Sequence, residues 1–203
     1  MFIGKFNKAF AVTSLGVISA IFGMYSAMNK NLGIAVLCLA ISGICDMFDG
    51  KIARKHNKTD EDSKYGIQID SLADIFAFGV FPVIILMTMG LNEWYHFVIY
   101  SMFIIAGITR LSYFNIMAEK GGPVKVFTGL PITSSSMAFP FFWILNTVLE
   151  TDFLHILYPI LMFIMSIFFI ANVKVIKKPG KVANIIFTIA AIAFTIWMLF
   201  IKN

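Results

Sequence analysis

The chain has 203 residues, of which 59% are hydrophobic and only 13% are charged. A typical soluble domain has about 25% charged residues, and a mean hydropathy of +0.86 leaves too little polar surface to cover a water-soluble globule. These values exclude a soluble enzyme, a disordered tail and a secreted disulfide scaffold. The apolar residues form long unbroken runs rather than the alternating pattern of a transmembrane β-barrel. The composition therefore predicts an all-α protein that crosses the membrane several times.

Seven apolar segments are long enough to cross a membrane by the rule of about 20 residues per span. In chain order, we expect transmembrane helices at 9–28, 32–55, 66–89, 94–117, 131–150, 153–173 and 183–201. The first segment follows Lys5 and Lys8, as in a signal peptide, but it is long and lacks a convincing cleavage site. We therefore expect a single transmembrane domain over 1–203, with a core at 9–173 and an additional helix at 183–201.

The basic residues predict one orientation in the membrane. If seven helices alternate, thirteen of the 16 lysines and arginines fall on one side. Only Lys30 and Lys202 fall on the other side, together with the acidic residues Glu93, Glu150 and Asp152. Because basic residues favour the cytoplasmic side, we expect a multi-pass protein of the cell membrane with a cytoplasmic N-terminus. This placement accounts for the net charge of +5 without a nucleic-acid partner.

Four aspartates lie within the second and third apolar segments, where lipid would demand apolar side chains. Asp46 and Asp49 are three residues apart, and Asp70 and Asp74 are four apart, so each pair shares one face of a helix. A rise of about 1.5 Å per residue puts Asp46 and Asp74 at a similar depth on the cytoplasmic side. Each carboxylate costs about 2.5–3.5 kcal/mol at a helix centre. The four therefore require either protonation, as in a proton relay, or divalent cations with hard oxygen ligands.

The neighbours of these aspartates favour a phosphate ligand that is held through cations. Gly50 and Ala53 leave space beside the first pair, and the planar guanidinium of Arg54 suits a phosphate. Gly66 lies one turn before Asp70, at the expected start of a helix, where free N–H groups favour anions. Together these residues predict a site for a metal-bound phosphate ester or pyrophosphate.

This arrangement resembles the signature of the CDP-alcohol phosphatidyltransferase family. The chain carries the signature as Asp46-x-x-Asp49-Gly50-x-x-Ala53-Arg54 and Gly66-x-x-x-Asp70-x-x-x-Asp74. The segment between its two halves is a little longer than expected, and the residues around 59–62 are interpreted as a solvated loop. The resemblance implies a six-helix core, a site at the cytoplasmic interface and a homodimer. It also implies two divalent cations, Mg²⁺ or Mn²⁺, held by the four aspartates.

The same resemblance implies a reaction and a role for each signature residue. The cations would bind the pyrophosphate of a CDP-linked lipid, and in-line attack by an alcohol would displace CMP. Asp74 would be the general base, while the other three aspartates would be chiefly metal ligands. The residues implied to bind the CDP-lipid are Gly50, Ala53, Arg54, Ser63, Gly66 and Thr13.

Two later stretches are similar to those of the small integral-membrane phosphatidylserine synthases within this family. They are Arg110-Leu111-Ser112-Tyr113-Phe114-Asn115 and Phe127-Thr128-Gly129-Leu130-Pro131-Ile132. This similarity implies CDP-diacylglycerol as the donor and L-serine as the acceptor. Arg110 could pair with the aspartates or bind an anion such as the serine carboxylate or a lipid phosphate. Asn115 and Lys125 are further candidates for binding the acceptor or a phosphate.

Other functions remain open on the sequence alone. The same chemistry could use glycerol 3-phosphate or an inositol phosphate, because Arg110, Lys125 and the lysines at 174–181 could bind its phosphate. An archaeal-type lipid donor is also possible. A cation- or proton-coupled transporter could use the aspartates as a relay, but that function would not explain the arginine and small residues beside the first pair.

Overall fold

The computed structural model describes residues 4, 8–53, 59–119, 127–149, 153–172 and 174–175, with the single positions 193 and 197. The elements are α1 (Lys8–Met28), α2 (Leu32–Ala53), α3 (Asp60–Asp74), the π-helix η1 (Ile75–Val80), α4 (Phe81–Thr88), α5 (Trp94–Glu119), β1 (Phe127–Thr128), the 3₁₀ turn η2 (Ile132–Ser134), α6 (Ser135–Val148), α7 (Leu154–Ile170) and β2 (Lys174–Val175). The two strands pair antiparallel over two residues each. Apart from the two single positions, the expected helix at 183–201 lies outside the described residues.

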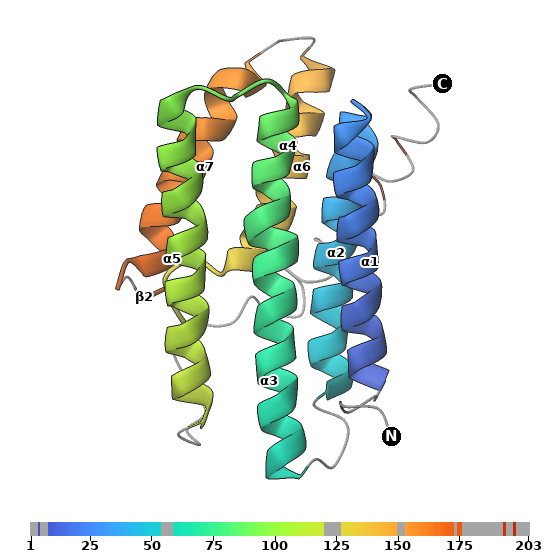
Figure 1. Ribbon diagram of the computed structural model, residues 1–203, viewed down its shortest axis with the longest axis vertical. Helices are drawn as coiled ribbons and strands as arrows, with labels where there is room; N and C mark the ends of the chain where they lie inside the picture. The colour runs from blue at the N-terminus through green and yellow to red at the C-terminus, as the bar shows by residue number, and fades with distance from the viewer. Residues whose placement is uncertain are drawn as a thin grey trace.

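The described part of the chain forms six helical columns, because α3, η1 and α4 run end to end (Figure 1). Four columns are long and apolar enough to span a membrane, namely Ala9–Met28, Leu32–Ile52, Glu61–Thr88 and Trp94–Ala118. Two columns are shorter, since α6 has 14 residues and α7 has 17. The prediction of an all-α, polytopic membrane protein with a six-helix core is confirmed.

The helices pack so that α1, α2, α3 and η1 surround the aspartates. α1 packs along α2, and the column of α3, η1 and α4 lies beside both, while α5 packs against α7 and α6 against α2 (Figure 1). At one end of the molecule, α3 and α5 extend beyond the ends of α6 and α7 (Figure 1). A span of 28 residues is about 42 Å long, more than the hydrocarbon core of about 30 Å. A straight span of this length therefore leaves room for the polar first turns of α3 outside the hydrocarbon.

Glycines allow the helices to approach closely at two points. A Cβ at Gly43 of α2 would lie 2.6 Å from the Cβ of Ser136 on α6, and one at Gly23 of α1 would overlap the ring of Phe81 on α4. Small residues at such points are typical of helix packing in membranes. Between the helices lies a core whose largest fully buried aromatic side chains are Phe78, Phe81, Phe103, Phe139 and Tyr158.

Two of the expected helix boundaries were wrong. α3 begins at Asp60 and not at residue 66, because Thr59 and Asp62 form a capping box. The hydroxyl of Thr59 accepts from the N–H of Asp62 at 3.2 Å, and the Asp62 carboxylate accepts from the N–H of Thr59 at 3.3 Å. Residues 59–62 are therefore the start of a helix rather than a solvated loop. The helix expected at 131–150 is shorter, since Pro131 is extended and a 3₁₀ turn precedes α6.

Candidate metal centre

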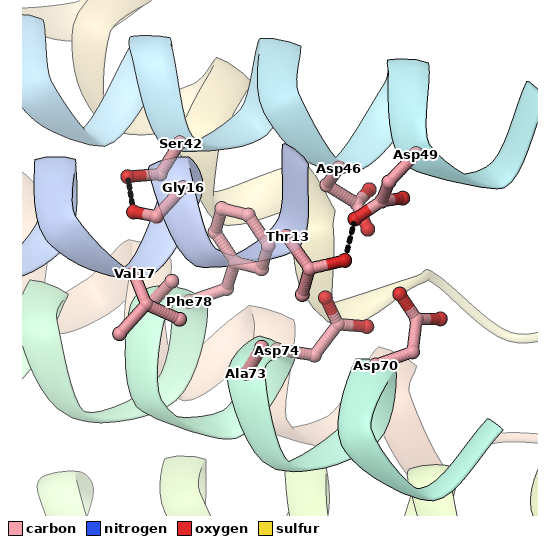
Figure 2. Close-up of a pocket in the computed structure, with 11 residues that line it drawn as sticks. Thr13, Gly16, Val17, Ser42, Asp46, Asp49, Asp70, Ala73, Asp74 and Phe78 are labelled. Carbon is pink, nitrogen blue, oxygen red and sulfur yellow. Dashed lines mark hydrogen bonds between the residues drawn. The ribbon is translucent and has the colours of Figure 1, made fainter. Parts of the chain in front are cut away.

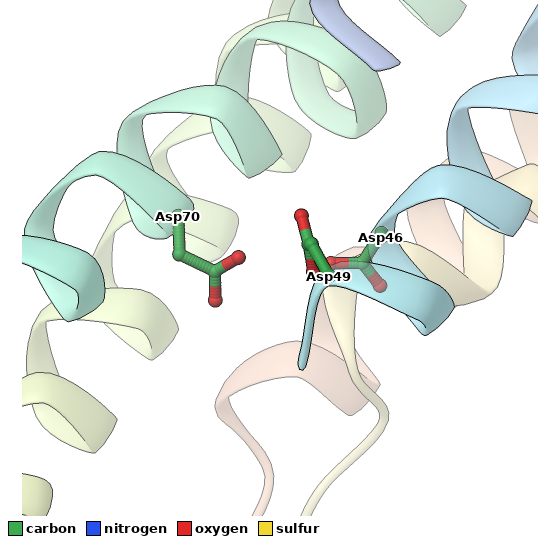
Figure 3. Close-up of side chains that lie close together, drawn as sticks. All are labelled: Asp46, Asp49 and Asp70. Atoms are coloured by element: carbon green, nitrogen blue, oxygen red, sulfur yellow. The ribbon is translucent and has the colours of Figure 1, made fainter. Parts of the chain in front are cut away.

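The four aspartates of α2 and α3 come together at one site. One carboxylate oxygen from each of Asp46, Asp49 and Asp70 lies within 4.8 Å of the other two (Figure 3). Asp74 lines the same pocket (Figure 2), and its carboxyl group lies within hydrogen-bonding reach of that of Asp46. Two carboxyl groups in such contact must share either a proton or a cation.

The space between the carboxylates has the size and the chemistry of a cation site. Its volume is about 10 Å³, roughly the space of one water molecule. Hard cations bind oxygen at about 2.0–2.6 Å, so two ligands of one ion lie at most about 4–5 Å apart, and the oxygens of Asp46, Asp49 and Asp70 lie within 4.8 Å of one another. Among the described residues that line the cavity there is no Lys, Arg or His. These donors therefore fit a divalent cation.

Thr13 of α1 orients one of the four aspartates. Its hydroxyl donates to the Asp49 carboxylate, with Oγ1 and Oδ2 2.6 Å apart (Figure 2), and also lies 3.1 Å from the carbonyl of Ala9 in its own helix. Asp49 is only 3% exposed, so this hydrogen bond from α1 is made inside the protein rather than in water. The sequence analysis assigned Thr13 to the CDP-lipid and did not foresee this contact, because a single sequence does not reveal which residues of α1 and α2 lie level with each other.

Residues that were not predicted from the sequence join α1 to α2 beside the aspartates. Ser42 lies one turn before Asp46, and its hydroxyl is 2.9 Å from the carbonyl oxygens of both Gly16 and Cys38 (Figure 2). A Cβ at Gly16 would lie 3.2 Å from the Cβ of Cys45, so this glycine allows the two backbones to approach. The one sequence signal for this approach was Gly16, which lies three residues after Thr13 on the same face of the helix. The other lining residues that were missed are Val17, Ala73, Ala77 and Phe78.

The residues assigned to the CDP-lipid lie on both helices of the site. Gly50 is half-buried on α2, Ala53 is the last residue of α2, and Arg54 lies outside the described residues. Ser63 is exposed at the start of α3. Gly66 is the seventh residue of that helix, beyond the four whose N–H groups are free. Gly66 therefore does not begin the helix, and the prediction that it offers a free N–H to an anion for that reason was wrong.

Arg110 lies in a second cavity, of about 270 Å³, between α5 and the end of α7. It is 6% exposed. Its guanidinium carbon is 4.5 Å from the centre of the Phe114 ring, and Nη1 is 3.4 Å from the carbonyl oxygen of Phe169. The other lining residues are Thr109, Tyr113, Ile170, Ala171 and Asn172. Neither Arg110 nor any other residue that lines this cavity lines the aspartate cavity. Lys125 lies outside the described residues.

Asn115 joins α5 to α3 at the level of the aspartates. Its side-chain oxygen accepts from the hydroxyl of Ser71 at 2.9 Å. Because Ser71 directly follows Asp70 and precedes Asp74 by less than one turn, this contact holds α3 in place beside the site.

The amino-acid sequence matches a model of the CDP-alcohol phosphatidyltransferase family over residues 6–202. The chain belongs to this family. It is therefore an enzyme of the CDP-alcohol phosphatidyltransferase type, and the matched region contains all four aspartates of the candidate metal centre.

Several relatives of this CDP-alcohol phosphatidyltransferase carry more specific names. The archaetidylserine synthase of Methanothermobacter thermautotrophicus is 27% identical over 174 residues, which cover 85% of this chain and 71% of the relative. The CDP-diacylglycerol–serine O-phosphatidyltransferase of Helicobacter pylori is 36% identical over 137 residues, which cover 64% of this chain but only 56% of the relative. The protein of the same name from Methanocaldococcus jannaschii is 29% identical over 180 residues, which cover 88% of this chain and 78% of the relative.

Proposed function

We propose that this enzyme transfers a phosphatidyl group from CDP-diacylglycerol to the hydroxyl of L-serine and releases CMP. The observation that carries the proposal is the convergence of four aspartates from facing helices around a cation-sized cavity. The choice of serine is supported by the names of the relatives and by the stretches at 110–115 and 127–132.

Asp46, Asp49, Asp70 and Asp74 would together hold two divalent cations, Mg²⁺ or Mn²⁺. When bound, such ions stabilise negative charge on the pyrophosphate and on the leaving oxygen. The absence of Lys, Arg and His from the described lining of the cavity supports this role, since four carboxylates need positive charge from elsewhere.

Asp74 would act as the general base. Its carboxylate would take the proton of the serine hydroxyl, and the serine oxygen would then form a bond to the phosphorus that carries the lipid. The bond from that phosphorus to the CMP oxygen breaks, and CMP leaves with the electron pair. A positioned general base is worth roughly 10²–10⁴-fold in rate.

The remaining site residues would bind the two substrates. The small side chains of the signature leave room for the nucleotide, and the guanidinium at position 54 suits its phosphates. The residues proposed for the CDP-lipid are Thr13, Gly50, Ala53, Arg54, Ser63 and Gly66. Those proposed for the acceptor or a phosphate are Arg110, Asn115 and Lys125. The buried guanidinium of Arg110 beside a cavity supports an anion there.

The proposed enzyme also has an expected oligomeric state and an expected orientation in the membrane. We expect a homodimer in the cell membrane, with the N-terminus and the active site facing the cytoplasm. The uneven distribution of lysines and arginines supports this orientation.

The direct test is an assay of CMP release by the purified protein with CDP-diacylglycerol and Mn²⁺. Separate reactions would contain L-serine, glycerol 3-phosphate, an inositol phosphate or no acceptor, and a parallel set would use an archaeal-type ether-linked donor. We expect CMP only with serine, and none after removal of the metal with EDTA. Equal release with another acceptor, or full activity in EDTA, would contradict the proposal.

The general base is tested by Asp74→Asn. We expect the rate of CMP release to fall by roughly 10²–10⁴-fold, because the amide cannot take the serine proton, while much of the CDP-lipid binding remains. Glu93→Gln makes the same chemical change at an exposed position near the start of α5 and should leave the rate unchanged. An Asp74→Asn enzyme with the wild-type rate would show that the base is another group.

A further inference from the structure

A π-helical turn directly follows the second aspartate pair. η1 spans Ile75–Val80, between Asp74 and the start of α4, and the N–H of Phe81 donates to the carbonyl of Phe76, five residues back. A π turn holds one residue more than the α-helical turn it replaces, and such turns occur frequently at functional sites. Ala77 and Phe78 of this turn line the aspartate cavity.

The π turn has an identifiable cause in the sequence. In an α-helix, the carbonyl of Phe78 would accept from the N–H of residue 82, but Pro82 has no N–H, and its ring would clash with that carbonyl. The hydroxyl of Ser135 on α6 supplies the missing donor, 3.0 Å from the Phe78 oxygen, and shares its proton with the carbonyl of Ile132 at 3.0 Å. Pro82 and Ser135 are both completely buried, so water cannot replace this contact.

The two ends of the wide turn are fixed by packing. A Cβ at Gly79 would lie 2.7 Å from Cδ1 of Ile75, and one at Gly107 of α5 would lie 3.3 Å from the same atom. At the other end, the ring of Phe81 lies against Gly23 of α1. Gly79 and Gly107 therefore make room for the side chain of Ile75, and Gly23 makes room for the ring of Phe81.

We propose that Pro82 and Ser135 are positioning residues that aim Asp70 and Asp74 at Asp46 and Asp49. They hold one extra residue in η1, and a straight α-helix of the same length would rotate the Asp70–Asp74 pair by about 100° relative to α4. The inference rests on the proposed function only in that the aspartates hold a divalent cation.

Pro82→Ala tests this role in the purified full-length protein, with Mn²⁺ alone as the probe and electron paramagnetic resonance as the measure of free ion. Alanine restores an N–H and favours the helix interior far more than proline does, so the helix should become α-helical and no less stable to heat. We expect Mn²⁺ affinity to fall at least roughly tenfold, as for lost support of metal ligands. Pro159→Ala, which changes a buried proline inside α7, should bind Mn²⁺ like the wild type.

A deletion provides the rescue. Removing Val80 from the Pro82→Ala protein takes out the extra residue, so an α-helix would now present Asp70 and Asp74 in their original direction. We expect Mn²⁺ affinity to return to within a few-fold of the wild-type value, an outcome that a general packing defect would not produce. Ser135→Ala should weaken Mn²⁺ binding, whereas Ser166→Ala, which removes a buried hydroxyl that bonds within α7, should not.

The outcomes separate this inference from the proposed function. If the wild-type protein binds no Mn²⁺, the metal role of the aspartates is wrong. If the wild type binds Mn²⁺ and Pro82→Ala binds it equally well, only the positioning role is wrong. A Pro82→Ala protein that unfolds, or a deletion that restores nothing, would also overturn the inference, because either result would mean that the proline serves the fold rather than the direction of the aspartates.

Discussion

Individual hydroxyl and amide groups from helices that carry no signature aspartate hold the acidic residues in place. Thr13 of α1 donates to Asp49 at 2.6 Å, and Asn115 of α5 accepts from Ser71, next to Asp70, at 2.9 Å. Both aspartate pairs are therefore supported from outside their own helices. Loss of such outer contacts usually costs about 10–100-fold in metal affinity.

Thr13→Val should weaken Mn²⁺ binding by roughly 10–100-fold, because the Asp49 carboxylate loses the donor that orients it. Thr13→Ser keeps the hydroxyl and should bind Mn²⁺ nearly as the wild type does. The measurement is a Mn²⁺ titration without substrates. Unchanged Mn²⁺ affinity in Thr13→Val, together with a raised KM for the CDP-lipid, would instead assign Thr13 to the nucleotide.

At the level of helices, the apolar runs predicted where most helices lie, and the spacing of the aspartates predicted that each pair shares one helical face. The starts of α1, α2 and α5 fall within one residue of their expected positions. The threonine and aspartate of the capping box before α3 are visible in the sequence at 59 and 62. The polar residues there interrupt the apolar pattern, and this interruption favours a loop over a membrane-spanning helix.

The π turn could not be predicted in the same way. Periodicity assumes 3.6 residues per turn throughout a helix, and Pro82 alone is compatible with a kink, a helix start or a wide turn. The choice depends on Ser135, which lies 53 residues further along the chain and supplies the donor across a helix interface. The contact of Thr13 with Asp49 has the same long-range character, so neither could be inferred from local sequence.

The packing of α2 on α6 gives a prediction about stability. Gly43→Ala should lower the free energy of unfolding by about 1–3 kcal/mol, because the new methyl group overlaps Ser136. In a Gly43→Ala background, Ser136→Gly should restore more than half of that loss. Thermal unfolding in detergent measures both variants. A Gly43→Ala protein as stable as the wild type would mean that α2 and α6 are not in close contact at this point.

For the whole molecule, the uneven charge distribution favours the proposed orientation of the four long helices in the membrane. The start of α3 and the end of α5 lie at the same end of the molecule as the start of α1 (Figure 1). The proposed orientation puts this end in the cytoplasm, where a water-soluble amino acid and CMP can reach the site. The acceptor would then enter from water and the CDP-lipid from the bilayer, and CMP would leave to the water.

Labelling with a membrane-impermeant maleimide tests this orientation. In sealed right-side-out vesicles, Asn92→Cys should be labelled at once, and Lys64→Cys only after permeabilisation; both positions are exposed. The wild type is the control, since Cys38 and Cys45 lie within α2. The opposite labelling pattern would put the aspartates on the outer side and would contradict the proposed orientation.

The most direct test of the account is to locate bound Mn²⁺ by its anomalous X-ray scattering in crystals of the protein. We predict a peak between α2 and α3, within about 2.0–2.6 Å of carboxylate oxygens of Asp46, Asp49 and Asp70. In Asp49→Asn crystals that peak should weaken or vanish. A strong peak elsewhere, with none between the two helices at saturating Mn²⁺, would contradict the assignment of the aspartates as the metal centre.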